Sequence, residues 1–249
     1  KLDYQTINSA YITNITLEGI LNDFETKLFN LTIKTRTKKF STSAELLNSI
    51  FYDLKTKSLN STLLGLSSGF YDLDSLTQGF QKSDLIIIAG RPSMGKTALG
   101  LNIALNITKN SRLPILFFSL EMSKEQIMYR LLSMETNISQ MKLKSGKLSQ
   151  NDWSKLNKIV KILSKLPIFI DDSFNLSILD IRSKIKTIIF EQNNIGLIIL
   201  DYLQLMQSSN NERENRVQEL SKITRSLKTL AREFNIPIIA LSQLSRNVE

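Results

Sequence analysis

The chain of 249 residues carries 32 Lys and Arg against 23 Asp and Glu, so its formal net charge is +9 at neutral pH. It contains neither Cys nor His, which excludes disulfides, thiolate zinc sites, cysteine nucleophiles and histidine general bases. Any catalysis must therefore use carboxylates, Lys, Arg, hydroxyls and backbone donors. The excess of basic residues favours a polyanionic partner. A basic surface that is merely exposed to solvent is the alternative explanation of the positive net charge.

The sequence offers no signal for membrane insertion or secretion. No apolar run approaches the roughly 18 residues of a membrane span. The stretch KLDYQTINSA at the start lacks the cationic and apolar blocks of a signal peptide. We expect no membrane partner. The richness in Ile, Asn and Lys suggests an AT-rich genome, which predicts the plastid stroma as location, with the bacterial cytoplasm as the alternative.

Residues 1–60 predict a helical linker. Apolar residues recur at helical spacing from Leu17 to about Lys34, and a second, shorter helical pattern covers Ala44–Leu54. Polar stretches separate these patterns from each other and from the rest of the chain. An amphipathic helix between polar linkers usually docks on another surface. We therefore expect a subunit-docking segment over residues 1–60 and a main domain over residues 61–249.

From about Leu66 the sequence alternates between short apolar runs and helical patterns. This alternation predicts an α/β domain in which helices cover a mostly parallel sheet. The predicted strands are DLIIIA, PILFFSLE, LPIFIDD, IGLIILD and NIPIIALSQ, whose continuous apolar runs suit burial on both faces. The predicted helices are Lys96–Lys109, Lys124–Met134, Asp152–Leu163, Ile178–Glu191 and Asn215–Phe234. The irregular stretch Gln207–Arg216 predicts an exposed loop.

The stretch GRPSMGKT fits the phosphate-loop pattern G-x-x-x-x-G-K-[ST] and lies between a predicted strand and a predicted helix. Its glycines allow a tight turn whose amides converge on phosphate oxygens, and the helix adds the positive end of its dipole. Lys96 can neutralise the β- and γ-phosphates, and the Thr97 hydroxyl can bind Mg²⁺. An ordinary glycine turn would leave the Lys-Thr pair unexplained. The nucleotide-binding set is Gly90, Arg91, Pro92, Ser93, Met94, Gly95, Lys96 and Thr97.

A second acid should hold Mg²⁺ through water at the end of a neighbouring strand. The candidates are Asp201, after LIIL, and Asp171 and Asp172, after IFI. The four bulky apolar residues before Asp201 are typical of a central strand, so the pattern favours Asp201 and leaves the other two open.

Hydrolysis also needs a group that polarises the attacking water. Glu121 ends PILFFSLE and is the candidate, although it could instead belong to the first turn of the next helix, where acids are favoured. Gln243 ends the last apolar run, where its amide could sense the γ-phosphate or serve as a satisfied polar strand end.

The order of GRPSMGKT, FFSLEMSKEQ, LIILDYLQLM and ALSQLSR resembles the replicative DNA helicases of the DnaB type, hexameric motors on a RecA-like P-loop core. The resemblance spans about Ser67 to Glu249 and is weaker over residues 17–60, which look like the family's linker helix that packs on a neighbouring subunit. It implies an enzyme, an ATP-hydrolysing DNA helicase that takes part in DNA replication and unwinds duplex DNA at the fork. Its implied cofactors are ATP and Mg²⁺, and its implied partners are single-stranded DNA, further copies of itself in a homo-hexamer, and a primase and a helicase loader within a primosome.

The resemblance also implies residue roles. Lys96, Glu121 and Gln243 would be catalytic, with Glu121 deprotonating water and Gln243 linking the γ-phosphate to DNA-binding loops. Asp201 would be the magnesium-associated acid. Arg130 matches a basic position to which the resemblance gives no firm role. Arg213 and Arg216, in the loop that faces the family's central channel, are candidates for DNA contact, and a solvated loop is the alternative.

Two departures from the family pattern shape the remaining expectations. The family's N-terminal collar domain finds no counterpart, and the chain stops six residues after Gln243, before the family's arginine finger. We therefore expect a fragment that comprises the linker and most of the motor domain. A RecA/RadA-type recombinase-like ATPase and a nucleotide-dependent assembly module without motor activity are the alternative functions.

Overall fold

The computed structural model describes residues 42–59, 65–174, 176–203 and 216–244. The chain divides into two compact units, residues 1–62 and 63–249, which are considered separately. In the first unit, α3 (Ser43–Leu59) is longer than the predicted Ala44–Leu54. The helix predicted over Leu17–Lys34 lies outside the described residues. Among the helices that the structure describes, none is long and apolar enough to cross a membrane.

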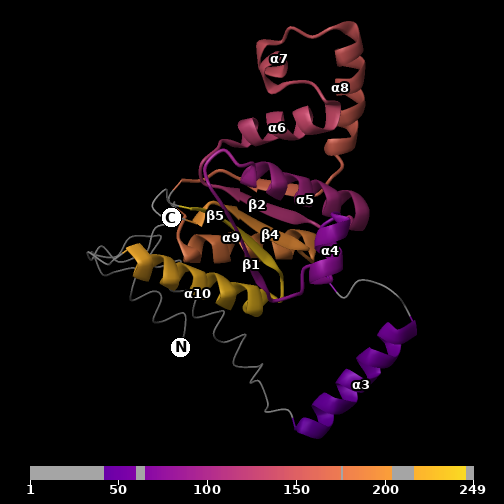
Figure 1. Cartoon of the computed structure of the whole chain (residues 1–249), viewed down its shortest axis with the longest axis vertical. Helices are drawn as coiled ribbons and strands as arrows, with labels where there is room; N and C mark the ends of the chain where they lie inside the picture. Colours follow the sequence, from indigo (N-terminus) through magenta and orange to yellow (C-terminus); the bar gives the residue numbers. More distant parts are fainter. Residues whose placement is uncertain (1–41, 60–64, 175, 204–215, 245–249) are drawn as a thin grey trace, which may run out of the picture. The chain divides into compact units, whose positions relative to one another are not determined.

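The second unit is built on a five-stranded parallel sheet in the order β1-β5-β4-β2-β3 (Figure 1). All five predicted apolar runs form strands, and the predicted fold class is confirmed. The strands are β1 (Leu85–Gly90), β2 (Ile115–Ser119), β3 (Ile168–Asp171), β4 (Leu197–Asp201) and β5 (Ile238–Gln243).

The helices connect these strands as a parallel sheet requires. The second unit contains α4 (Tyr71–Thr77), α5 (Lys96–Ser111), α6 (Lys124–Thr136), α7 (Gln140–Ser145), α8 (Gln150–Leu163), α9 (Ile178–Gln192) and α10 (Arg216–Phe234). Five of these match predicted helices to within three residues at each end. The short helices α4 and α7 were not predicted, because six or seven residues are too few to display a helical repeat.

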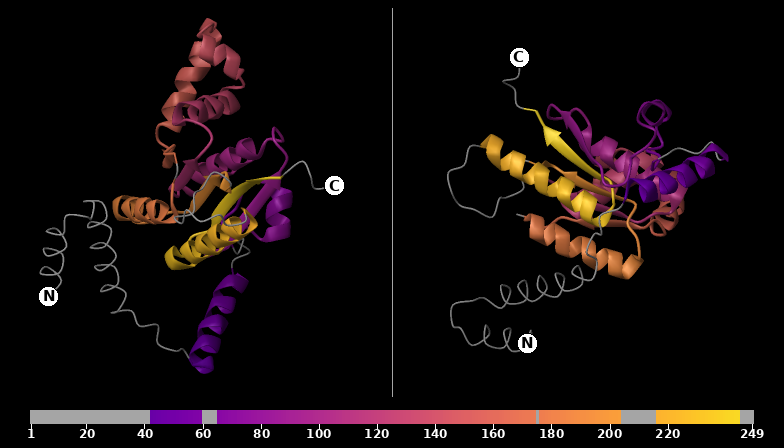
Figure 2. Two further views of the ribbon diagram at one scale, coloured as in Figure 1. Left: turned by 90° about the vertical axis from the view of Figure 1, so that its left-hand side faces the viewer. Right: turned by 90° about the horizontal axis from the view of Figure 1, so that it is seen from below.

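The sheet separates two apolar cores, since successive strand residues point to opposite faces. One face of β2, β4 and β5 packs on α9 and α10, through residues such as Phe118, Ile198 and Leu227. The other face packs on α5 and α6, through residues such as Phe117 and Ile199. Figures 1 and 2 show α5 on the side of the sheet opposite α9 and α10, and Figure 1 shows α6, α7 and α8 extending beyond α5.

Burial on both faces, predicted for every strand, holds for the inner strands and fails at the edges. β2 and β4 are buried along their whole length, whereas β1 and β3 are mostly half-buried. Ile87 of β1 is 45% exposed. The reason is position, because β1 and β3 each pair with one strand in the described sheet, through β5 and β2 respectively. An apolar run therefore indicates a strand without fixing its place in the sheet.

Candidate nucleotide-binding site

The carboxyl ends of four strands bring the predicted site residues to one edge of the sheet. In the register of the sheet, Gly90 at the end of β1 lies beside Gln243 at the end of β5. Likewise, Ser119 at the end of β2 lies beside Asp201 at the end of β4. Ligands of open α/β sheets bind outside the carboxyl ends of the strands. This edge is therefore where a ligand site is expected.

The segment between β1 and α5 forms the predicted phosphate loop. Gly95 is the N-cap of α5 and has a φ of 85°. Glycine adopts this left-handed conformation without strain because it has no Cβ atom. Ser93 also has a positive φ of 64°. Two left-handed residues within three positions curl the backbone tightly before the helix. The remaining loop residues, Arg91, Pro92 and Met94, are exposed, so the loop surface is open to a ligand.

Lys96 lies over this loop at the first position of α5. Its Nζ donates hydrogen bonds to the carbonyl oxygens of Gly90, at 2.9 Å, and Arg91, at 3.0 Å. The two carbonyls hold the ammonium beside the amino end of α5, which carries the positive end of the helix dipole. The ammonium and the helix end together attract an anion such as phosphate.

Thr97 and Asp201 meet across the site. The Thr97 hydroxyl donates a hydrogen bond of 2.6 Å to Oδ2 of Asp201. Asp201 is 1% exposed. Burial raises the pKa of Asp201, and the neighbouring Glu121 carboxylate adds to this, while the hydrogen bond from Thr97 and the charges of Arg130 and Lys96 act in the opposite direction. The peptide bond that follows Asp201 is cis.

The two alternative acids lie elsewhere. Asp171 ends the edge strand β3 and accepts hydrogen bonds from Lys184 and from the Ser173 amide. Asp172 accepts a hydrogen bond of 3.0 Å from the Lys124 amide at the start of α6. Neither lines the cavity that contains Thr97. Of the three candidates, Asp201 alone is in contact with the phosphate-loop threonine.

Glu121 lies beside the phosphate loop, although not in either of the two predicted local settings. β2 ends at Ser119, and α6 begins at Lys124 after its N-cap Ser123. Glu121 therefore belongs to the bend between them, so both its assignment as a strand end and the alternative first-turn assignment were wrong. The helix start is set by Ser123, whose hydroxyl accepts a hydrogen bond from the Gln126 amide. Glu121 is exposed and forms no ion pair with a residue that the structure describes.

One cavity of about 650 Å³ collects most of the predicted site residues. Its lining includes, from the predicted set, Pro92, Ser93, Gly95, Lys96, Thr97, Glu121, Asp201 and Gln243. Gly90 borders it through its carbonyl contact with Lys96. Mg²⁺ commonly binds one or two protein oxygens together with substrate phosphates. The Thr97 hydroxyl and the Asp201 carboxylate fit that donor set, and the described residues contain no cluster of three or more acids that would form a separate metal cage.

The cavity also contains residues that sequence reasoning missed or left without a role. Gln126 and Arg130 reach it from α6, and Gln140 and Lys144 reach it from α7. The Nε atom of Arg130 is buried and has no hydrogen-bond partner in the described structure. A buried donor without an acceptor is costly, so this atom fits an anionic ligand. Gln126 and Arg130 are four residues apart in a helix that was predicted to begin soon after Glu121, so the sequence could have indicated that they share one helix face. No local signal marks Gln140 or Lys144.

Of the two predicted DNA-contact residues, Arg216 lies within the described part of the chain. Arg213 lies outside the described residues, as does most of the predicted loop Gln207–Arg216. Arg216 is the first residue of α10, so the loop prediction was wrong at this position. The predicted helix Asn215–Phe234 also included this position, and at Arg216 the structure agrees with the helix.

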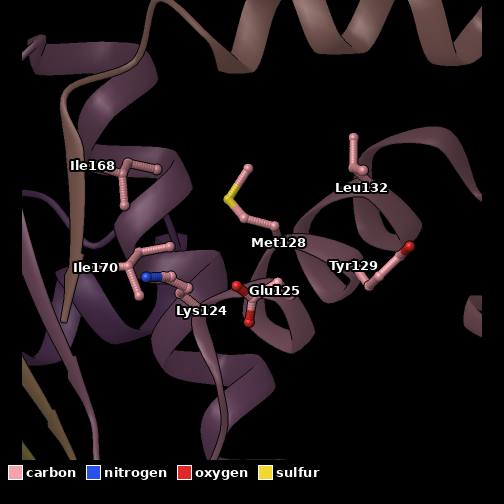
Figure 3. Close-up of a pocket in the computed structure, with 7 residues that line it drawn as sticks. All are labelled: Lys124, Glu125, Met128, Tyr129, Leu132, Ile168 and Ile170. Carbon is pink, nitrogen blue, oxygen red and sulfur yellow. The ribbon is translucent and has the colours of Figure 1, made fainter. Parts of the chain in front are cut away.

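A second concavity lies between α6 and the edge strand β3. It has a volume of about 560 Å³, and its apolar lining consists mainly of Met128, Leu132, Ile168 and Ile170 (Figure 3). Lys124 and Glu125 are the charged groups of its lining. None of the predicted site residues lines this apolar groove, and no residue of the phosphate loop reaches it. The cavity at the strand ends is therefore the candidate site for chemistry.

Comparisons with known proteins show the family to which the chain belongs. Residues 65–249 match the family model of the DnaB-like helicase C terminal domain. A "Probable replicative DNA helicase" from the alga Trieres chinensis is 65% identical over 249 residues, which cover 100% of this chain and 55% of the relative. The chain thus spans about half the length of this relative.

Solved structures show the same similarity at the level of the fold. A solved ATPase domain superposes with a TM-score of 0.77 at 33% identity, covering 84% of this chain and 74% of that chain. A DnaB-like replicative helicase, whose structure was described with its interactions with primase, gives a TM-score of 0.82 at 29% identity, covering 99% of this chain and 56% of that one.

Proposed function

Because the chain belongs to the family of the DnaB-like helicase C-terminal domain, we propose that it is the ATP-hydrolysing motor of a replicative DNA helicase. The observation that carries this proposal is the single cavity shared by the phosphate loop, Glu121, Asp201 and Gln243. A phosphate loop alone would support any nucleotide-binding protein. The added carboxylate and strand-end amide supply what hydrolysis and its coupling to motion require.

ATP would bind with its phosphates over the loop from Gly90 to Thr97. The backbone amides, the Lys96 ammonium and the amino end of α5 would neutralise the phosphates. Thr97 would bind Mg²⁺ directly, and Asp201 would hold it through water. When bound, Mg²⁺ would neutralise charge that develops on the phosphate oxygens. Arg130 would supply a further donor through its unpaired Nε.

Glu121 would act as the general base. Its carboxylate would accept a proton from a water molecule whose oxygen attacks the γ-phosphorus, while the bond from that phosphorus to the oxygen of ADP breaks. The exposed bend that carries Glu121 leaves the carboxylate unengaged by other described side chains and open to solvent water. Positioned general bases contribute on the order of 10²–10⁴-fold to rate.

Gln243 would report the state of the γ-phosphate. It ends β5, which pairs with the phosphate-loop strand β1 on one side and with the Asp201 strand β4 on the other. A change in contact at Gln243 would therefore act on the residues that follow β5. We infer that these residues, the segment before α10 with its Arg213, and Arg216 at the start of α10 contact single-stranded DNA, chiefly at its phosphates.

Assembly into a homo-hexamer is proposed for the first unit. Four exposed apolar residues of α3 form one stripe at helical spacing: Leu47, Ile50, Phe51 and Leu54. We propose that residues 1–60 are a docking segment, that α3 packs on a neighbouring subunit, and that residues 61–249 are the motor domain. Primase and a helicase loader are proposed partners of the assembled helicase, and the primase interactions described for the related helicase support the first of them.

The plastid stroma is the proposed location. The composition typical of an AT-rich genome and the similarity to the relative from the alga Trieres chinensis support it. The bacterial cytoplasm remains the alternative.

The proposed function is tested by ATP turnover with and without single-stranded DNA. The unchanged chain should hydrolyse ATP faster with DNA, and Lys96→Ala should lose nucleotide binding and turnover in both conditions. Lys147→Ala, which removes an exposed lysine outside the cavity, should behave like the unchanged chain. DNA-stimulated hydrolysis that survives in Lys96→Ala would refute the phosphate-loop role. Turnover that ignores DNA would favour an assembly module, and strand exchange without strand displacement would favour a recombinase.

A further inference from the structure

The nucleotide cavity has a second wall that the sequence motifs do not mark. One wall consists of the phosphate loop and the strand ends. The other consists of α6 and the six-residue helix α7, which contribute Arg130, Gln140 and Lys144. Because α7 follows the phosphate loop by more than forty residues, its place at the cavity is a result of tertiary structure alone.

α7 is fixed at both ends, so its side chains have defined positions. The Ser139 hydroxyl accepts a hydrogen bond from the Lys142 amide at the amino end. At the other end, Gly146 has a φ of 69° and donates its N–H to the Leu143 carbonyl. Leu143 itself is buried. Lys142 forms a 2.5 Å ion pair with Asp152, the capping-box acid at the start of α8.

This anchoring separates the roles of the α7 lysines. Gln140 and Lys144 are four residues apart and therefore share one helix face, which lines the cavity. Lys142 instead points to Asp152. Lys144 is exposed and forms no ion pair or hydrogen bond with the residues that the structure describes. Its ammonium is therefore available to a ligand in the cavity.

The charges of the cavity favour a strongly anionic ligand. Three cationic side chains, Lys96, Arg130 and Lys144, line it together with the carboxylates of Glu121 and Asp201. Asp201 accepts a hydrogen bond from Thr97, and the Arg130 Nε has no acceptor among the described residues. A ligand with several negative charges, such as a triphosphate, would be attracted to these cations.

We propose that Lys144, held by α7 together with Gln140, is a substrate-binding residue that contacts the terminal phosphate of a nucleoside triphosphate. This inference rests on the proposed function. Glu121, the proposed general base, lies just before the start of α6. The wall formed by α6 and α7 is therefore on the same side of the cavity as Glu121. The phosphate that the water attacks is the terminal one, and it is therefore the phosphate that Lys144 meets.

The inference is tested by the affinity of the full chain for a non-hydrolysable ATP analogue and for ADP, both with Mg²⁺. Lys144→Gln should weaken binding of the analogue about fivefold and leave ADP binding within about twofold, because the lost charge faces the terminal phosphate. Lys144→Arg should keep most of the affinity. Lys147→Gln is the matched control, since it removes an exposed lysine of the same segment that does not line the cavity.

The outcomes separate this inference from the proposed function. Unchanged analogue affinity in Lys144→Gln, an equal loss in Lys147→Gln, or an equal loss for ADP and the analogue would overturn the role of Lys144. If in the same assay Lys96→Ala abolishes binding, the nucleotide site of the proposed function stands whatever the result at Lys144. If the unchanged chain binds neither nucleotide, the proposed function fails and this inference fails with it. Thermal unfolding of each variant shows whether a loss reflects a folding defect, and rescue by Lys144→Arg would argue against one.

Discussion

The hydroxyl of Thr97 donates a 2.6 Å hydrogen bond to the Asp201 carboxylate, joining two residues that are 104 positions apart in the sequence. Thr97 belongs to the first turn of α5, and Asp201 ends β4. This contact places the phosphate loop beside the one strand-final acid that is almost fully buried among the described residues. The same two oxygens are those that we propose for Mg²⁺.

The first prediction concerns this pair. Thr97→Val keeps the shape of the side chain and removes the hydroxyl, so it should weaken Mg²⁺-dependent ATP binding by about tenfold or more, a change of about 1.4 kcal/mol. Thr97→Ser, which keeps the hydroxyl, should stay near the unchanged value. Titration of each variant with ATP, once in the presence of Mg²⁺ and once in the presence of EDTA, measures the two affinities. If Thr97→Val binds ATP equally well in Mg²⁺, the hydroxyl is not a metal ligand.

A second prediction concerns stability at the edge strand β3. Lys184 and the Ser173 amide donate hydrogen bonds to Asp171 at the end of this strand. Burial alone would raise the pKa of Asp171, but these bonds outweigh it and lower the pKa. Because the pKa in the folded state lies below the unfolded value of about 3.9, the pair stabilises the fold above about pH 4. This stabilisation is lost as the pH falls through the lowered pKa.

Lys184→Met should therefore reduce the free energy of unfolding by about 1–3 kcal/mol at pH 7, since it leaves a half-buried carboxylate without its cation. The difference from the unchanged chain should shrink as the pH falls below about 4. Lys228→Met is the control, because Lys228 pairs with Asp84 at the surface, with side chains 46% and 49% exposed, and should cost at most about 1 kcal/mol. Urea unfolding at several pH values decides the matter. A Lys184→Met effect that is independent of pH would contradict the assigned ion pair.

A third prediction concerns assembly through α3. Ile50→Asp places a charge in the apolar stripe of Leu47, Ile50, Phe51 and Leu54, and it should shift the protein from hexamers to smaller species. Asn48→Asp adds the same charge to an exposed position outside the stripe and should leave the hexamer intact. Analytical ultracentrifugation distinguishes the two. The docking role of α3 would be wrong if both variants assembled like the unchanged chain.

The sequence was a good guide wherever the deciding information is local. The phosphate loop is recognisable because its glycines, lysine and threonine must follow one another between a strand and a helix. The inner strands β2 and β4 are recognisable because burial on both faces favours apolar residues at every position. These features predict the α/β fold class and place Lys96 and Thr97 at the start of a helix without reference to the rest of the molecule.

The remaining features depend on which strands become neighbours. Asp171 and Asp201 each end an apolar run, yet β4 lies between β5 and β2 whereas β3 lies at the edge. The sheet order, which no local pattern encodes, therefore separates the buried Asp201 from the salt-bridged Asp171. Lys144 is a similar case, because its helix is too short to show a repeat and reaches the cavity through contacts with α6 and α8.

The most direct test of the proposed ATPase is the hydrolysis of ATP by Glu121→Gln in the presence of single-stranded DNA. This change keeps the size of the side chain and removes the base. The variant should bind ATP with an affinity within about twofold of the unchanged chain and should hydrolyse it at least about 10²-fold more slowly. Turnover at the unchanged rate would remove Glu121 from the chemistry and contradict the assignment of this cavity as the hydrolytic site.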